Sequence, residues 1–484
     1  MTAKTIVNFG GNVTFQPRHA YAPADEAEVL KILAEHRGQR IRAIGSLHSW
    51  SEATVANEVL LTLEHLNHVR VIQEAGRTVA DVGAGCQLKH LLAELEAQGG
   101  WMLPSLGLIT EQTIAGATST GTHGSGGHSL SHYLVEVRVA TYDANGDPVI
   151  RTFDSGVELQ AARCALGCLG IVVSVKILCR PIFRIEERVG RYQNVDDVLA
   201  AEDNYPLQQF FYFPWTWEFG AQHRRETTLP RSGSAWLYRD YWFYGIDIGL
   251  HLIVLMMVQA LKSSLGVRFF FRHLFTKFVI FNWTVVDKAV PMLIMEHELF
   301  RHIEIEIFVR RPELPATLEF VRDIVSWFAG DVKDVTPKTQ QMLDDHHLPL
   351  PVKGWGSYTH HYPICVRRIF PDDTLISPAS GPDGPWYAVS FISYARPADR
   401  AGFLGFTTFL ARAGALLFQA RPHWGKVCPI DHQTATQLYP HLPAFREVCE
   451  SVDPLHRFRN DWVEAVLFGG KTGNGEGQSS QRAI

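Results

Sequence analysis

The spacing of apolar residues predicts a helix near the start of the chain. Residues 25–37 carry apolar side chains on one helical face, with acidic residues in the first turn. Residues 40–44 then alternate as a short strand does, and GSLHSW at 45–50 follows as a loop. His48 is therefore expected to lie in a loop held between regular elements.

Strand patterns dominate the next part of the chain. Alternating or continuous apolar runs predict strands at 59–63, 69–73, 77–82, 135–140, 149–153 and 171–178. A leucine-rich face at 88–95 predicts a helix that stops at Gly99, and Asn145 with Gly146 predicts a hairpin turn. The N-terminal part is therefore α+β or α/β, with short mixed elements.

Residues 106–132 contain many Gly, Ser and Thr and almost no charge. Because Gly has no Cβ, such a stretch can bring backbone N–H groups close to phosphates. The GxGxxG pattern of dinucleotide-binding Rossmann folds, with its following acidic residue, is not found there. His123, His128 and His132 lie in this stretch, but no carboxylate or thiolate completes a close set, so we expect no metal site.

Residues 210–300 are rich in aromatic and basic residues, and 250–261 form a strongly apolar run. As a helix this run would extend about 18 Å, short of the roughly 30 Å of a bilayer core, which disfavours a membrane span. Two interpretations stay open: a buried helix, and a peripheral membrane contact through residues 240–283. A proline-rich loop at 371–386 and a hydrophobic helix at 401–420 follow.

Size and charge limit the class of protein. A chain of 484 residues exceeds what one hydrophobic core usually serves, so two domains are expected. A net charge of -5 argues against nucleic-acid binding, and seven scattered cysteines predict reduced thiols. The N-terminus shows no apolar run of signal-peptide length, so a cytoplasmic location, with or without peripheral membrane contact, is expected. The polar tail at 470–484 is predicted to be disordered.

Four motifs in a fixed order carry a family resemblance. They are GSLHS at 45–49, ATSTGTHGSG at 117–126, RPHWGK at 421–426 and DPLHRFRNDW at 453–462. Together they resemble the vanillyl-alcohol-oxidase superfamily of FAD oxidoreductases, and more narrowly its sugar-1,4-lactone oxidase and alditol oxidase group. The resemblance covers residues 17–183 and 421–469 and is weakest between 190 and 300.

The resemblance implies an α+β fold with a two-lobed FAD-binding domain of the vanillyl-alcohol-oxidase (PCMH) type. The domains expected from it are 1–183 for FAD binding, 184–415 for an α+β substrate or cap domain, and 416–469 for a C-terminal segment that completes the flavin site.

The resemblance also implies that FAD is bound covalently through His48. An imidazole nitrogen can add to the electrophilic 8α carbon of the flavin, which makes the flavin easier to reduce. Contacts to the flavin or its diphosphate are implied for Gly45, Ser46, Ser49, Gly107, Thr113, Gly116, Ser119, Gly121, Thr122, His123, Gly124, Ser125, Gly170, Val172, His423 and Lys426.

Hydride transfer leaves negative charge on the flavin's pyrimidine edge, and a fixed cation there lowers the barrier. Lys426 and Arg367 hold positions that resemble this role. Relatives often carry Glu two residues before that arginine, where this chain has Cys365. Candidates for a polar substrate contact or a base are Glu304, Glu306, His360 and His361.

These features predict an FAD-dependent oxidase that acts on a CH–OH group of a sugar 1,4-lactone, such as D-arabinono- or L-gulono-1,4-lactone. Oxygen is the expected acceptor and hydrogen peroxide the product. Gly107 favours oxygen access, since a plant lactone dehydrogenase has Ala at the matching position. Three alternatives stay open: a membrane-associated dehydrogenase that uses a quinone or cytochrome, an alditol oxidase, and a catalytically silent binding protein.

Overall fold

The N-terminal half of the molecule contains two sheets. The computed structural model describes residues 4–295 and 299–470. The first sheet is parallel, in the order β3 (His19–Tyr21), β5 (Val59–Thr62) and β4 (Ile41–Ile44). Helix α1 (Glu26–Glu35) connects β3 to β4, and the Asp25 side chain accepts a hydrogen bond from the Glu28 N–H at its start. The helix and strand predicted here are confirmed.

The second sheet of this half is antiparallel throughout. Its order is β10 (Pro148–Phe153), β9 (Leu134–Tyr142), β11 (Ile171–Leu178), β7 (Arg77–Gly83) and β6 (Val69–Glu74). These are the strands that the apolar runs predict, and α2 (Leu88–Ala97) is the predicted leucine-rich helix. Within the Gly/Ser/Thr stretch, however, α3 (Ile114–Thr120) forms a short helix, because the Thr113 side chain accepts from the Gly116 N–H.

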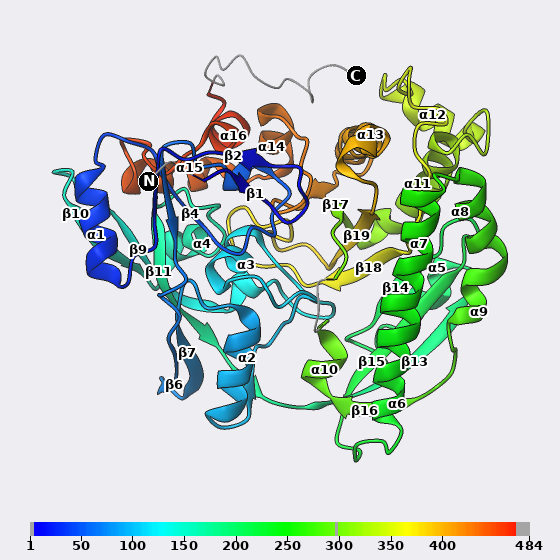
Figure 1. Ribbon diagram of the computed structural model, residues 1–484, viewed down its shortest axis with the longest axis horizontal. Helices are drawn as coiled ribbons and strands as arrows, with labels where there is room; N and C mark the ends of the chain where they lie inside the picture. The colour runs from blue at the N-terminus through cyan, green and yellow to red at the C-terminus, as the bar shows by residue number, and fades with distance from the viewer. Residues whose placement is uncertain (1–3, 296–298, 471–484) are drawn as a thin grey trace.

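The other half of the molecule, which we call the cap, is organised on one eight-stranded antiparallel sheet (Figure 1). Its order is β16 (Val285–Lys288), β13 (Arg184–Tyr192), β15 (Phe219–Thr227), β14 (Gln209–Tyr212), β18 (Ile364–Ile369), β19 (Trp386–Ser393), β17 (Ile303–Arg310) and β20 (Arg421–Pro422). The edge strand β20 comes from the C-terminal segment, so that segment belongs to the cap sheet before it returns to the N-terminal half.

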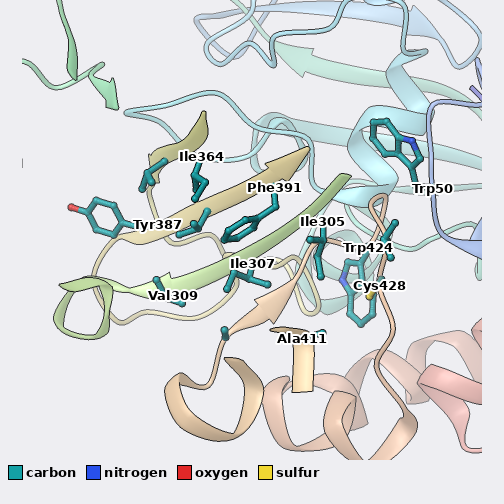
Figure 2. Packing of buried hydrophobic residues seen from close by; sticks show 14 of the residues in the cluster. Trp50, Ile305, Ile307, Val309, Ile364, Tyr387, Phe391, Ala411, Trp424 and Cys428 are labelled. Atoms are coloured by element: carbon teal, nitrogen blue, oxygen red, sulfur yellow. The ribbon is translucent and has the colours of Figure 1, made fainter. Parts of the chain in front are cut away.

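Strand β17 has one apolar face and one polar face. Apolar and acidic residues alternate at the start of its sequence, IEIEIFVR, and successive side chains of a strand point to opposite faces. Ile305 and Ile307 face the buried core beside α13 (Ala401–Phe418), as Figure 2 shows. Glu304 and Glu306 consequently point to the opposite face, where they line a cavity.

Two helical segments form the outer part of the cap. A continuous helix, Ala235–Ala260, contains α6 (Ala235–Asp240) and α7 (His251–Leu255), and it is followed by α8 (Ser264–Phe270) and α9 (Thr276–Phe278). Among the described residues, Ala235–Ala260 and α13 are long and apolar enough to cross a membrane by length and composition. In the most apolar 18-residue stretch of α13, 56% of the residues are buried, but in that of Ala235–Ala260 only 22% are. The interpretation of residues 250–261 as a buried helix is therefore wrong for the side that exposes Leu252 and Met256.

The C-terminal helices close the fold against the first sheet. Arg42 on β4 donates to the Phe458 carbonyl at 2.7 Å, and the Ile41 N–H donates to the Arg457 carbonyl at 2.8 Å. The remaining elements are β1 (Ile6–Val7), β2 (Thr14–Phe15), β8 (Trp101–Met102), β12 (Arg180–Pro181), α4 (Gly156–Ala162), α5 (Val195–Ala200), α10 (Ala289–Leu293), α11 (Leu314–Phe328), α12 (Pro337–Asp345), α14 (His432–Leu438), α15 (Leu442–Val452) and α16 (Asp461–Val463). The predicted disordered tail lies outside the described residues apart from Gly470.

Candidate active site

A cavity of about 770 Å³ lies between the N-terminal half and the cap sheet. This volume falls in the range of small-molecule and cofactor sites. The predicted site residues that line it are Gly45, Ser46, His48, Ser49, Gly107, Thr113, Gly116, Ser119, Thr122, His123, Gly170, Val172, Glu304, Glu306, Arg367, His423 and Lys426. Motifs far apart in the sequence thus meet on one wall.

The loop that carries His48 is held in a defined shape. Leu47 has a positive φ of 60°, a conformation that costs energy in a non-glycine residue. Phe9 stacks on the His48 ring at 5.0 Å between centroids. The Trp50 N–H donates to the Gly425 carbonyl at 2.8 Å, which ties the first motif to the RPHWGK motif. His48 is therefore fixed at the cavity wall.

The wall around this loop fits the FAD that the resemblance implies. A Cβ at Gly45 would lie 2.4 Å from Thr113 Oγ1, and one at Gly107 would lie 2.8 Å from Thr122 Cγ2. Threonine side chains pack so closely against these two positions that a Cβ would collide with them, and both glycines line the cavity. These loops could hold the diphosphate and one edge of the flavin ring.

A partly buried ion pair forms part of the cavity floor. Lys426 donates to Glu304 in a short contact, and Ser390 on the neighbouring strand β19 also donates to Glu304. The Lys426 ammonium group lies 4.6 Å from the centre of the Trp50 ring, a cation–π distance. The lysine is thus held by two groups, Glu304 and the Trp50 ring, so its charge has a fixed place at the cavity.

Glu306 lies in a second buried cluster, with His123 and His423. Their ligand atoms all lie within 4.8 Å of one another, which is metal-ligand spacing, and the argument from the local sequence against a metal could not foresee this grouping. Burial raises the pKa of Glu306, but facing His123 and nearby Lys426 outweigh it and hold that pKa well below its usual range. Burial lowers the pKa of His423 to about 3. Among the described residues Glu306 Oε1 has no hydrogen-bond partner.

Strand β18 brings Arg367 and Cys365 to the same cavity. Arg367 Nε donates to Gln209 Oε1 at 3.1 Å, and the Gln209 amide donates in turn to Gln222. Burial works against the charge of Arg367, but Cys365 and the two glutamates outweigh it and raise its pKa. Burial raises the pKa of the Cys365 thiol, which therefore stays neutral.

The cap contributes an apolar wall that the sequence motifs did not identify. It consists of Phe211, Phe213, Trp242, Phe243, Ile246, Leu250, Phe275, Met292, Ile294, Leu299 and Phe300. Its charged residues are mostly paired: Arg224 and Tyr238 both donate to Glu187. Burial raises the pKa of Asp247 to about 7, which favours the neutral acid below that pH. The aromatic richness of 210–300 was the one sequence signal for this wall.

Several predicted residues lie outside the cavity wall. Gly121 ends α3 with a positive φ of 81°, and Ser125 Oγ donates to the Gln208 carbonyl at 2.5 Å. Gly124 packs against the backbone of Leu106. His360 and His361 are buried beside Tyr358 and Tyr394 rather than at the cavity. These residues shape the surrounding loops.

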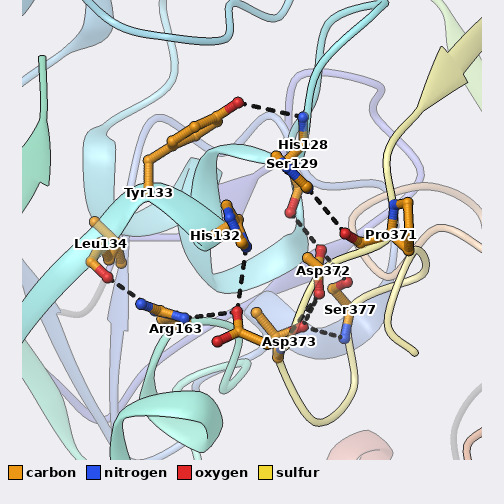
Figure 3. Close-up of polar contacts among 11 residues, drawn as sticks. His128, Ser129, His132, Tyr133, Leu134, Arg163, Pro371, Asp372, Asp373 and Ser377 are labelled. Atoms are coloured by element: carbon orange, nitrogen blue, oxygen red, sulfur yellow. Dashed lines mark hydrogen bonds and ion pairs between the residues drawn. The ribbon is translucent and has the colours of Figure 1, made fainter. Parts of the chain in front are cut away.

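His128 and His132 also have structural contacts. His128 Nδ1 lies 2.9 Å from the Pro371 carbonyl, and His132 Nδ1 lies 3.2 Å from Asp373 (Figure 3). Ser129 donates to Asp372 at 2.7 Å in the same network. These contacts pin the 371–377 loop to the end of the Gly-rich stretch.

Two protein families match the sequence. Residues 17–150 match the family described as FAD binding domain, and residues 175–466 match the family described as D-arabinono-1,4-lactone oxidase. The second match spans more than half of the chain. The chain belongs to the D-arabinono-1,4-lactone oxidase family. The protein is accordingly an FAD-dependent oxidase that acts on CH–OH donors, which confirms the resemblance and the predicted cofactor.

Relatives within this family differ in their named substrates. A long-chain alcohol oxidase from an uncultured marine euryarchaeote is 50% identical over 95% of this chain and 96% of its own length. An L-gulonolactone oxidase of Bos taurus is 25% identical (93% and 96%), and an alditol oxidase of Streptomyces sp. is 24% identical (96% and 99%). Among solved structures, cholesterol oxidase from Brevibacterium sterolicum superposes with a TM-score of 0.68 at 14% identity, covering 96% and 97% of the two chains. That likeness confirms the predicted α+β fold of the PCMH type.

Proposed function

We propose that this oxidase acts on primary alcohols with a long apolar chain rather than on sugar lactones. The apolar cap wall carries this proposal. A sugar lactone exposes hydroxyl groups all round, and each would lose its hydrogen bonds to water against Trp242, Ile246 and Leu250. An alkyl chain gains about 0.8 kcal/mol for each methylene buried there. The relative named as a long-chain alcohol oxidase supports the same choice.

The polar floor then has the task of positioning the hydroxyl end. Glu306 Oε1 is available to accept a hydrogen bond from the substrate hydroxyl, because it has no partner among the described residues. Arg367 and Lys426 supply fixed positive charge to the same part of the cavity. Bound FAD supplies the two-electron oxidation of CH–OH to a carbonyl, with oxygen as the proposed acceptor and hydrogen peroxide as product.

The test is peroxide release by the FAD-loaded protein over a series of detergent-dispersed primary alcohols. We expect kcat/KM to rise by up to about fourfold per added methylene until the cavity is filled. D-arabinono-1,4-lactone and xylitol should react poorly. Faster turnover of the lactone than of any alcohol would restore the lactone assignment, and flavin bleached by alcohol but not recoloured by oxygen would indicate a quinone or cytochrome acceptor.

A matched pair of variants locates the chain-binding wall. Ile246→Gln places an amide in the cavity, whereas Leu252→Gln changes an exposed residue of the same helix. We expect Ile246→Gln to lower kcat/KM for long alcohols about tenfold and to leave short alcohols nearly unchanged. Leu252→Gln should react as the wild type does in detergent. Equal loss on short and long alcohols would place the chain elsewhere.

A further inference from the structure

Exposed apolar side chains gather on one part of the cap. Of the twenty large apolar side chains exposed in the described part of the chain, eleven lie between residues 236 and 280. They include Leu252 and Met256 on the Ala235–Ala260 helix and Leu265 and Phe269 on α8. We call this surface, residues 236–280, the outer face. Concentrated apolar exposure of this kind marks an interaction surface.

The outer face lies over the substrate cavity. The same helices that expose Leu252 and Phe269 outward turn Trp242, Ile246 and Phe275 inward to the cavity. An α-helix with its side chains is about 10 Å across, so the apolar wall is one helix thick. Figure 1 shows α8 and α9 at the edge of the cap farthest from the sheet of β6–β11. The surface is thus continuous with the apolar end of the cavity.

The charge of this segment is opposite to that of the whole chain. Residues 236–280 contain five basic residues and two acidic ones, whereas the chain carries a net charge of -5. Both acidic residues, Asp240 and Asp247, line the cavity, as does the basic residue Arg239. Arg272 and Lys277 are exposed beside Phe269 and Phe278, and Arg272 also pairs with Asp331 at 2.6 Å. Lys262 and Arg268 are likewise paired, with Asp399 and Asp331. Basic residues among exposed aromatic and aliphatic side chains are typical of helices that lie in the headgroup region of an anionic membrane.

The helices are fixed to the cap along one side, which argues against a span. Gln259 donates to the Tyr394 carbonyl at 2.6 Å, and Tyr241 OH donates to the Phe278 carbonyl at 2.7 Å, which joins the two helical segments. Leu250 and Val254 are buried against the cap. A helix held in this way presents only its other side to lipid.

We propose that the outer face docks on an anionic lipid bilayer, and that the apolar alcohol enters the cavity directly from the lipid. The docking step stands without the proposed substrate; the entry step rests on the proposed function. A long-chain alcohol partitions into lipid, so docking brings the cavity to the phase that holds the substrate.

The test of docking is flotation of the full-length, FAD-loaded protein with vesicles of phosphatidylcholine and phosphatidylglycerol. We expect the wild type to float and Leu265→Glu/Phe269→Glu to lose at least about tenfold in vesicle affinity, since two buried apolar side chains become charges. The control is Val157→Glu/Leu455→Glu, which changes two similarly exposed apolar residues of the N-terminal half and the C-terminal segment. Wild type that stays with the unbound fraction, or equal flotation of both double variants, would overturn docking.

Two further measurements separate the remaining outcomes. A wild-type dimer without lipid that Leu265→Glu/Phe269→Glu converts to a monomer would show that a second copy covers the face, and would overturn the proposal. On hexadecanol, the double variant should match the wild type in detergent and fall at least about tenfold below it when the alcohol is supplied in vesicles. Equal rates in vesicles would overturn entry from lipid. If no alcohol reacts in either medium, the proposed function fails, while the flotation result still decides docking.

Discussion

At the scale of single residues, His48 carries the most direct prediction. Its ring lies at the cavity wall, stacked on Phe9, in a loop tied to Gly425 by the Trp50 backbone N–H. We expect acid-precipitated wild type to keep its yellow colour and His48→Ala to lose it. His132→Ala, which changes a histidine bound to Asp373 outside the cavity, should keep the colour. Colour released from the wild-type pellet would mean that FAD is bound without the covalent bond.

Variants of Lys426 and Glu304 can separate the effect of the lysine's charge on the reaction rate from its effect on the stability of the fold. Lys426→Met removes the cation from the cavity floor and leaves the buried Glu304 carboxylate with its hydrogen bond from Ser390. We expect the rate of flavin reduction by alcohol to fall about 100-fold and unfolding to become easier by about 3 kcal/mol. Adding Glu304→Gln should restore most of the stability but not the rate. Recovery of both would show that the lysine acts only through folding.

At the scale of elements, Cys365 on β18 is where this chain departs from the family pattern. The cavity already holds Glu304 and Glu306 near this position, so a third carboxylate would be desolvated without a new cation. We expect Cys365→Glu to raise KM for long alcohols about tenfold, and the near-isosteric Cys365→Ser to change it less than twofold, in steady-state peroxide assays. An unchanged KM in Cys365→Glu would place the alcohol away from β18.

The elements also show what the sequence could predict. The motif order implied His423 and Lys426, and Glu304 and Glu306 were among the candidates for a substrate contact or a base. The convergence of His123 with Glu306 and His423 was not predictable, because it depends on three segments meeting across two halves of the fold. Composition also could not show which of the two apolar helices, α13 or Ala235–Ala260, is buried. Both are apolar enough to cross a membrane, and α13 is the more buried one because it packs against β17 and its neighbours.

At the scale of the whole molecule, sequence motifs implied which residues contact FAD, whereas no motif identified the residues of the apolar cap wall. The residues for which the resemblance implies FAD contacts belong to short motifs, whose chemistry depends on the cofactor. The apolar wall comes from scattered aromatic and aliphatic side chains of 211–300, and no local pattern says which of them face inward. The choice between lactone and alcohol therefore rests on tertiary structure, since the two substrates make opposite demands on that wall.

Buried histidines predict how the whole fold responds to acid. Burial lowers the pKa of His360 to about 3 and the pKa values of His361 and His223 to about 4, against about 6.5 in an unfolded chain. Below pH 6.5 the unfolded chain therefore binds protons that the native state does not, so stability is complete above that pH and falls toward pH 4. Each histidine contributes a loss of up to about 1.4 kcal/mol per pH unit in this window.

Urea unfolding at pH 7.5 and pH 5 measures this loss, and His360→Gln tests its origin. His360 suits the test because it lies outside the FAD cavity, so cofactor binding does not change its surroundings directly. Glutamine does not titrate, and it can keep a contact like the one between His360 Nδ1 and Tyr358 OH. The variant should lose less stability than the wild type on going to pH 5, by about 1–2 kcal/mol. Equal losses would mean that His360 is protonated in both states, and that other groups, such as the carboxylates that titrate below pH 5, control the acid response.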